Sequence, residues 1–211
     1  MKIWMALLVA GLAYGGTAAA EAPDYGYLEL GLGHQNGNDL SGGYSGQVQM
    51  SVPVTEESFL YGRIGSRNYG RYSYSNRRED IIQDYWQLGG GVHLPLSSRG
   101  EAVLRAGYLY ADTQEGSFRG ADRSAPSAGL GVRWIVIPDF EVSLFYDRDT
   151  GAFDPQGLAQ TFGGLRAGVW QNVYSLGLRW QLYTHTAFGA TLERSDFKGE
   201  SRSLLTFAYC F

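Results

Sequence analysis

Apolar and polar residues alternate with a two-residue period along most of the chain. Near its start, Leu28, Leu30 and Leu32 alternate with Tyr27 and Glu29. This period is typical of a β-strand with one apolar side and one polar side. It recurs in about ten segments of roughly ten residues, the length that a tilted strand needs to cross a bilayer. The other segments contain the alternating runs 48–54, 60–64, 86–94, 104–110, 130–136, 140–146, 174–182, 188–192 and 205–211.

Short and long connections also alternate along the chain. The short ones are 52–57, 95–100, 137–139 and 183–186; the longer polar linkers are 34–44, 68–83, 111–125, 148–170 and 195–202. Outer-membrane barrels have this arrangement, with short turns in the periplasm and long loops outside. We therefore predict an all-β protein, a closed antiparallel up-and-down transmembrane β-barrel of about ten strands. Residues 158–170 fit either a loop or the start of a strand, which leaves eight or twelve strands open.

A soluble β-sandwich also alternates, but it does not require aromatic residues at the strand ends. Here the ends of the segments carry two sets of aromatic residues, as expected of rings that lie at the two membrane interfaces. The first set is Tyr25, Phe59, Phe140, Trp180, Tyr183, Phe188 and Phe211, and the second is Trp86, Tyr110, Tyr146 and Tyr174. This pattern favours the barrel.

The N-terminus indicates export. Met1 and Lys2 precede an apolar run, and residues 17–20 offer small side chains for cleavage. We therefore expect residues 1–20 to be a signal peptide and residues 21–211 to form the barrel domain. The single cysteine, Cys210, excludes an internal disulfide framework. The net charge of −4 argues against nucleic-acid binding.

The chain ends in an alternating apolar strand, with Leu205, Phe207, Tyr209 and the terminal Phe211 at every second position. A terminus usually frays unless pairing holds it, and in a closed barrel the last strand pairs with the first. This ending resembles the assembly signature of bacterial outer-membrane proteins. The size is similar to small barrels of the OmpA and OmpX type, although that type usually has eight strands. The resemblance implies an outer-membrane location and insertion by the barrel-assembly machinery.

The polar side of the strands predicts a charged lumen. Opposite charges that face one another in a narrow lumen are expected to pair, because an unpaired buried charge is unfavourable. The predicted lumen network consists of Glu29, Arg63, Arg67, Arg105, Arg133, Glu141, Asp147, Arg179 and Glu193. Such a network would fill the barrel. The alternative is a narrow porin-like channel, since rings of arginine set ion selectivity.

The linker at 68–83 combines cations with aromatic rings. Arginine recognises phosphate and tyrosine lies well at interfaces, so this linker is a candidate contact for outer-membrane lipid, including lipopolysaccharide. The candidate residues are Arg71, Tyr72, Tyr74, Arg77 and Arg78.

No catalytic, metal or cofactor residues are assigned. Residues 147–154 (DRDTGAFD) miss the spacing of a calcium loop. His34 with nearby Asp39 is the basis of the weakest alternative, a lipid-modifying enzyme. The leading prediction is a monomeric, non-enzymatic barrel that supports surface contacts.

Overall fold

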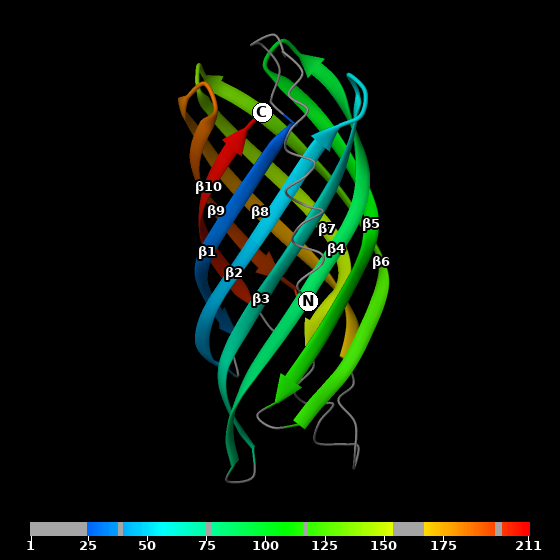
Figure 1. Cartoon of the computed structure of the whole chain (residues 1–211), viewed down its shortest axis with the longest axis vertical. Coiled ribbons are helices and arrows are strands. Elements are labelled where there is room, and N and C mark those ends of the chain that lie inside the picture. The colour runs from blue at the N-terminus through cyan, green and yellow to red at the C-terminus, as the bar shows by residue number, and fades with distance from the viewer. Residues whose placement is uncertain (1–24, 38–39, 75–76, 116–117, 154–166, 197–199) are drawn as a thin grey trace.

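The computed structural model describes residues 25–37, 40–74, 77–115, 118–153, 167–196 and 200–211. These residues form ten strands (Figure 1). The strands are β1 (Tyr27–Gly37), β2 (Leu40–Pro53), β3 (Ser58–Tyr74), β4 (Arg77–Ser97), β5 (Gly100–Glu115), β6 (Phe118–Ile137), β7 (Phe140–Phe153), β8 (Ala167–Tyr183), β9 (Thr186–Ser195) and β10 (Ser201–Cys210). Within the described ranges, no helix is long and apolar enough to span a membrane. The predicted signal peptide, residues 1–20, lies outside these ranges.

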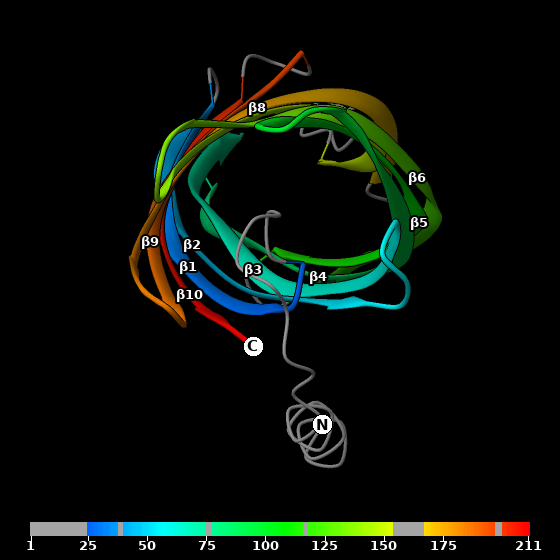
Figure 2. The same ribbon diagram turned by 90° about the horizontal axis from the view of Figure 1, so that it is seen from above.

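Each strand pairs with the next, and β1 pairs with β10 to close the sheet. All pairs are antiparallel, and the closing pair runs in unbroken register from Tyr27 opposite Cys210 to Asn36 opposite Ser201. Figure 2 shows the resulting ring from above. A closed sheet has no open edge, so every strand has a partner on both sides. The predicted up-and-down barrel and its ten strands are confirmed.

The two ends of the barrel differ. One end, here called the turn end, holds the short connections 54–57, 98–99, 138–139 and 184–185 together with the start of β1 and the end of β10. Asp139 in the third of these turns has a φ of 67°, a left-handed conformation that is common in tight turns. The N–H of Phe211 donates to the carbonyl of Gly26 at 2.9 Å, so pairing extends to the last residue. The opposite end is called the loop end.

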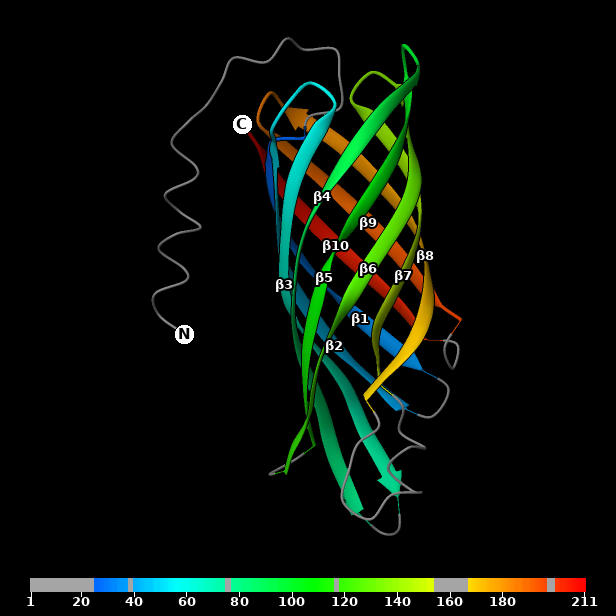
Figure 3. The same cartoon turned by 90° about the vertical axis from the view of Figure 1, so that its right-hand side faces the viewer.

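Strands replace most of the polar linkers that the sequence predicts as loops. Residues 68–74 belong to β3 and 77–83 to β4, strands of 17 and 21 residues. Figure 3 shows this hairpin running past the ends of β1 and β2. The prediction was wrong here because it equated polar sequence with loop. Above a membrane both sides of a strand can face water, so a polar run can continue the ladder.

The two sides of each strand have different surroundings. Along β10, exposed and buried residues alternate without exception. The outward side is apolar and exposed, whereas the inward side forms the filled lumen. Tyr25 and Phe59, predicted at the membrane interface, are 8% and 7% exposed and belong to the lumen. That placement was wrong, since Phe59 precedes the outward-facing Leu60 and therefore points inward.

Candidate functional site in the barrel lumen

The turn end of the lumen is filled by Tyr25, His93, Glu101, Arg133 and Glu141, here called the turn-end cluster. Arg133 forms a bidentate pair with Glu141, with Nε 2.9 Å from Oε1 and Nη2 2.7 Å from Oε2. Its Nη1 lies 3.3 Å from Glu101 Oε1. Glu101 also accepts a hydrogen bond from the Tyr25 hydroxyl and lies 3.2 Å from His93 Nδ1. One carboxylate thus joins three side chains.

Tyr25 connects two opposite parts of the barrel wall through the lumen. It precedes β1, whereas Glu101 is on β5, four strands away around the ring. Its ring stacks on His93 with centroids 4.2 Å apart, and the Arg133 guanidinium lies 4.7 Å from its centroid. Burial raises the pKa of the Tyr25 hydroxyl, which therefore remains protonated and able to donate. The aromatic ring acts as a bar across this end of the barrel.

Further along the lumen lies a middle cluster of Tyr61, Gln87, Arg105, Ser127 and Asp147. Arg105 binds both carboxylate oxygens of Asp147, with Nε 2.8 Å from Oδ1. Gln87 Nε2 donates to Ser127 Oγ at 2.8 Å and to the Tyr61 hydroxyl at 3.3 Å. Side chains thereby link β3, β4 and β6 in one set of contacts and β5 with β7 in another.

Glycine makes room for the aromatic ring in this cluster. A Cβ on Gly89 or Gly107 would lie 2.7 or 2.8 Å from the Tyr61 hydroxyl oxygen. These two residues, paired on β4 and β5, leave a bare patch of backbone that Tyr61 covers. A side chain at either position would displace the ring, so the glycines are needed for this packing.

The third group, the loop-end cluster, consists of Gln47, Arg67, Tyr85, Glu193 and Arg202. Arg202 Nε lies 2.9 Å from Glu193 Oε2, and Nη2 donates to Gln47 Oε1 at 2.8 Å. Its Nη1 lies 3.3 Å from the Tyr85 hydroxyl, which itself donates to Gln47 at 3.0 Å. The Arg67 guanidinium stacks 4.6 Å from the Tyr85 ring centroid.

Arg202 is on β10 and Tyr85 on β4, so this cluster also bridges nearly opposite walls. A cavity of about 30 Å³ borders it, lined by Arg67, Glu193 and Arg202 among others. That volume has room for one or two water molecules. The lumen is therefore crossed by side chains at two levels, near the turn end and toward the loop end.

All nine residues of the predicted lumen network lie on inward-facing positions. Two predicted pairs meet directly, Arg105 with Asp147 and Arg133 with Glu141. Glu193 instead pairs with Arg202, and Arg63 donates to Gln87 at 2.8 Å.

Three members remain. Arg67 belongs to the loop-end cluster, where it stacks on Tyr85. Arg179 and Glu29 form no ion pair among the residues that the structure describes. Arg179 Nη2 lies 2.9 Å from Cys210 Sγ, and its guanidinium is 5.0 Å from the Tyr27 ring centroid. Glu29 interacts with Arg179 electrostatically.

Two charged residues that organise the lumen were missed by the sequence analysis, Glu101 and Arg202. Arg202 was counted in the linker 195–202, and Glu101 lies between the connection 95–100 and the alternating run 104–110 and was assigned to neither. Their positions in the two-residue period would have identified them as lumen residues. Glu101 lies on the same side of its strand as Val103 and Arg105, and Arg202 lies on the same side as Leu204.

The other predicted sites have different outcomes. Arg71, Tyr72, Tyr74, Arg77 and Arg78 lie on the backbone of β3 and β4, but their side chains are outside the described part of the structure. Leu205, Phe207 and Tyr209 face outward on β10, with Phe211 directly beyond it. His34 is exposed on β1, and Asp39 lies outside the described ranges. Among the described residues, no group of three or more His, Cys, Asp or Glu side chains could hold a metal ion.

The chain is similar to known proteins in its structure. No protein-family model matches the chain, and no curated protein matches it in sequence. An outer-membrane channel from Pseudomonas putida F1 matches with a TM-score of 0.56 and 12% identity, covering 94% of this chain and all of the channel. The NanC porin matches with a TM-score of 0.53 and 9% identity, covering 87% of this chain and all of the porin.

The structural neighbours are thus bacterial outer-membrane β-barrel proteins. At these identities the likeness concerns the fold. It does not single out barrels of the OmpA and OmpX type.

Proposed function

We propose that this protein is a small outer-membrane barrel with a structural, surface-supporting role and a lumen closed by its own side chains. The location is supported by the outward side of the strands. Aromatic pairs stand there toward the loop end: Trp86 stacks on Tyr110 at 5.6 Å, and Tyr146 lies 5.4 Å from Tyr174. Below them the outward residues are apolar and exposed, as a hydrocarbon-facing band requires. The turn end, with the start of β1 and the end of β10, would face the periplasm.

The observation that carries the closed lumen is the pair of cross-lumen contacts. Tyr25 with Glu101 bars the turn end, and Arg202 with Tyr85 bars the lumen toward the loop end. A barrel of about ten strands is only slightly wider than eight-stranded barrels, whose interiors are filled by side chains. The paired charges therefore stabilise the wall and leave little path for solute. No catalytic role is proposed for these groups.

Planar-bilayer conductance of the refolded barrel tests this function. The wild type is expected to show no stable conductance steps. The double variant Tyr25→Ala/Arg202→Ala removes one crossing side chain at each level and is expected to conduct. The matched control Tyr183→Ala/Arg99→Ala changes the same residue types at exposed turn-end positions and is expected to remain silent. Retained heat-modifiable gel mobility shows that each variant is folded.

A narrow channel is the second candidate. Arg63 donates to an amide and Arg179 to a thiol, so their charges lack a bound carboxylate in the described structure. Such charges would favour small anions. The neighbours described as a porin and a channel also point this way. Stable wild-type steps that change in Arg105→Ala or Arg133→Ala would replace the closed barrel with this channel.

Two expected partners belong to the same proposal. The alternating β10, followed directly by Phe211, would be recognised by the barrel-assembly machinery. The β3–β4 hairpin, whose strands include Arg71, Tyr72, Tyr74, Arg77 and Arg78, would contact lipopolysaccharide from above the membrane. Both roles fit a monomeric barrel.

A further inference from the structure

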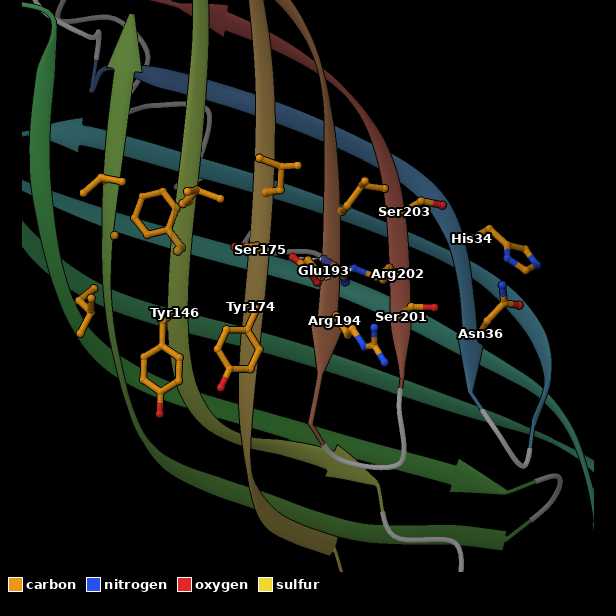
Figure 4. A pocket seen from close by; sticks show the side chains of 17 residues that line it. His34, Asn36, Tyr146, Tyr174, Ser175, Glu193, Arg194, Ser201, Arg202 and Ser203 are labelled. Atoms are coloured by element: carbon orange, nitrogen blue, oxygen red, sulfur yellow. Dashed lines mark hydrogen bonds and ion pairs between the residues drawn. The ribbon is translucent and has the colours of Figure 1, made fainter.

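A groove of about 760 Å³ lies on the outer face of the barrel and crosses six strands, from β6 through β10 to β1 (Figure 4). Its volume is in the range of sites that bury small ligands, roughly 300–1,000 Å³. The outward residues that line it form two cross-strand rows. Register defines the first row as Val132, Leu144, Leu176, Leu192, Ser203 and His34, and the second as Leu130, Tyr146, Tyr174, Arg194, Ser201 and Asn36.

The groove changes character along its length. On β6 to β8 it is apolar, with leucine and valine in the first row and the Tyr146–Tyr174 pair in the second. On β9, β10 and β1 it becomes polar, with Arg194, Ser201 and Asn36 in sequence across three strands. Figure 4 shows these polar side chains on the side of Tyr174 that faces away from Tyr146, with Arg194 on the strand next to Tyr174. The groove therefore has one apolar end and one polar end.

This polarity follows depth in the membrane. β9 and β10 have ten residues each, about the length that spans a bilayer, and Arg194 and Ser201 lie at their loop ends. The leucines of the first row lie deeper, because Leu144, Leu176 and Leu192 are four, seven and six residues from the turn ends of their strands, whereas Arg194 and Ser201 are eight and nine residues from theirs. The apolar end thus reaches into the hydrocarbon, and the polar end lies at the outer interface. A lipid has the same order of acyl chain and headgroup.

Among the residues that the structure describes, the charge at the polar end has no ion-pair partner. Arg194 is exposed and forms no ion pair within the described ranges. Asp196, two residues along the same side, accepts hydrogen bonds from the backbone and side-chain nitrogens of Asn172, the former at 2.8 Å. Glu193 faces the lumen and pairs with Arg202. The Arg194 guanidinium is therefore available to an anion from the membrane.

We propose that this groove binds a phosphorylated glycolipid of the outer leaflet. Its acyl chain lies along the leucines of β7 to β9, and its phosphate accepts hydrogen bonds from Arg194. The neutral groups of Ser201, Ser203 and Asn36 beside the single arginine suit sugar hydroxyls, which a simple phospholipid headgroup offers in smaller number. The site is separate from the β3–β4 hairpin, and it rests on the proposed outer-membrane location.

Titration of the refolded barrel in detergent with purified lipid A, followed by native mass spectrometry, tests the site. Arg194→Ala is expected to weaken lipid A binding about tenfold, as loss of a charge-assisted hydrogen bond implies. Arg99→Ala, an exposed arginine at the opposite end, is expected to bind as the wild type does. Dephosphorylated lipid A should bind weakly and equally to wild type and Arg194→Ala.

Two results would overturn the proposal. One is wild-type affinity for lipid A in folded Arg194→Ala. The other is equal affinity for phosphatidylglycerol, with the same dependence on Arg194, which would assign the groove to phospholipid instead. Because binding is measured in micelles, it does not depend on conductance, and cell fractionation tests location separately. A result that contradicts glycolipid binding in the groove can therefore be distinguished from one that contradicts the closed-barrel function.

Discussion

At the residue scale, the position of a side chain in the two-residue period outweighs its chemical type. Leu204 and Leu205 are the same residue in succession on β10, yet they are 2% and 61% exposed. The first packs in the lumen and the second points outward from the barrel. Arg133 likewise lies at an inward-facing position and is the centre of a buried network, although arginine is usually a surface residue.

Arg133 is expected to be among the largest single contributors to stability. Arg133→Ala leaves the carboxylates of Glu101 and Glu141 buried without their cation, which should lower the free energy of unfolding by about 3–5 kcal/mol. Urea titration of the refolded barrel in micelles, read by gel mobility, measures the change.

A matched pair of variants separates this effect from loss of any arginine. Arg99→Ala, exposed in a turn, should change the free energy of unfolding by less than about 0.5 kcal/mol. The triple replacement Glu101→Leu/Arg133→Met/Glu141→Leu removes all three charges and should be less harmful than Arg133→Ala alone. Equal stability of Arg133→Ala and Arg99→Ala would contradict the network.

The sequence predicted well which residues face the lumen, but it predicted poorly which of them contact one another. Parity places Arg105 and Asp147 on the same side of their strands, and opposite charge suggests that they pair. The contact of Arg202 with Tyr85 depends on which strands face one another across the ring and on their relative height. Neither quantity is encoded in a local pattern, so cross-lumen contacts required the three-dimensional structure.

At the element scale, the strands are longer than their apolar stretches. β4 has 21 residues, but its outward side is continuously apolar only from Trp86 toward the turn end. The sequence therefore revealed the part of each strand that meets lipid and mistook the remainder for loop. In water, paired strands can carry polar side chains on both faces. A search for alternating hydrophobic residues cannot detect such strands.

β10 offers a test of which side meets hydrocarbon and at what depth. Leu205 lies outward at the middle of this ten-residue strand, and Ser201 lies outward at its loop end. Leu205→Arg should destabilise the barrel in lipid vesicles by roughly 2–4 kcal/mol, because a cation at the bilayer midplane is unfavourable. Ser201→Arg should cost only about 0–1 kcal/mol, as expected near an interface.

Denaturant titration in vesicles of defined thickness compares the two variants. Repeating it in detergent micelles, which adapt around a charged side chain, provides the control. Equal costs for the two substitutions in vesicles would show that β10 does not cross a bilayer with this face outward.

At the scale of the whole molecule, the wall of the barrel has unequal height. β9 and β10 span little more than a bilayer, whereas β3 to β6 have 16 to 21 residues. In the proposed outer-membrane location, the taller strands would continue beyond the membrane on the loop side. The low section of wall coincides with the polar end of the outer groove. In the proposed membrane location, the low wall brings the interface close to Arg194, which explains why a charge without an ion-pair partner among the described residues is tolerated there.

Cysteine labelling on β4 measures where the membrane ends on the tall side. Asp84 points outward opposite Asp112 of β5, and two such carboxylates are not expected within hydrocarbon. In a Cys210→Ser background, Asp84→Cys in intact cells should react with a membrane-impermeant maleimide. Val92→Cys, on the same side of β4 but nearer the turn end, should react only after the membrane is dissolved and the barrel unfolded. Labelling of Val92→Cys in intact cells, or protection of Asp84→Cys, would move the membrane boundary and with it the depth assigned to the outer groove.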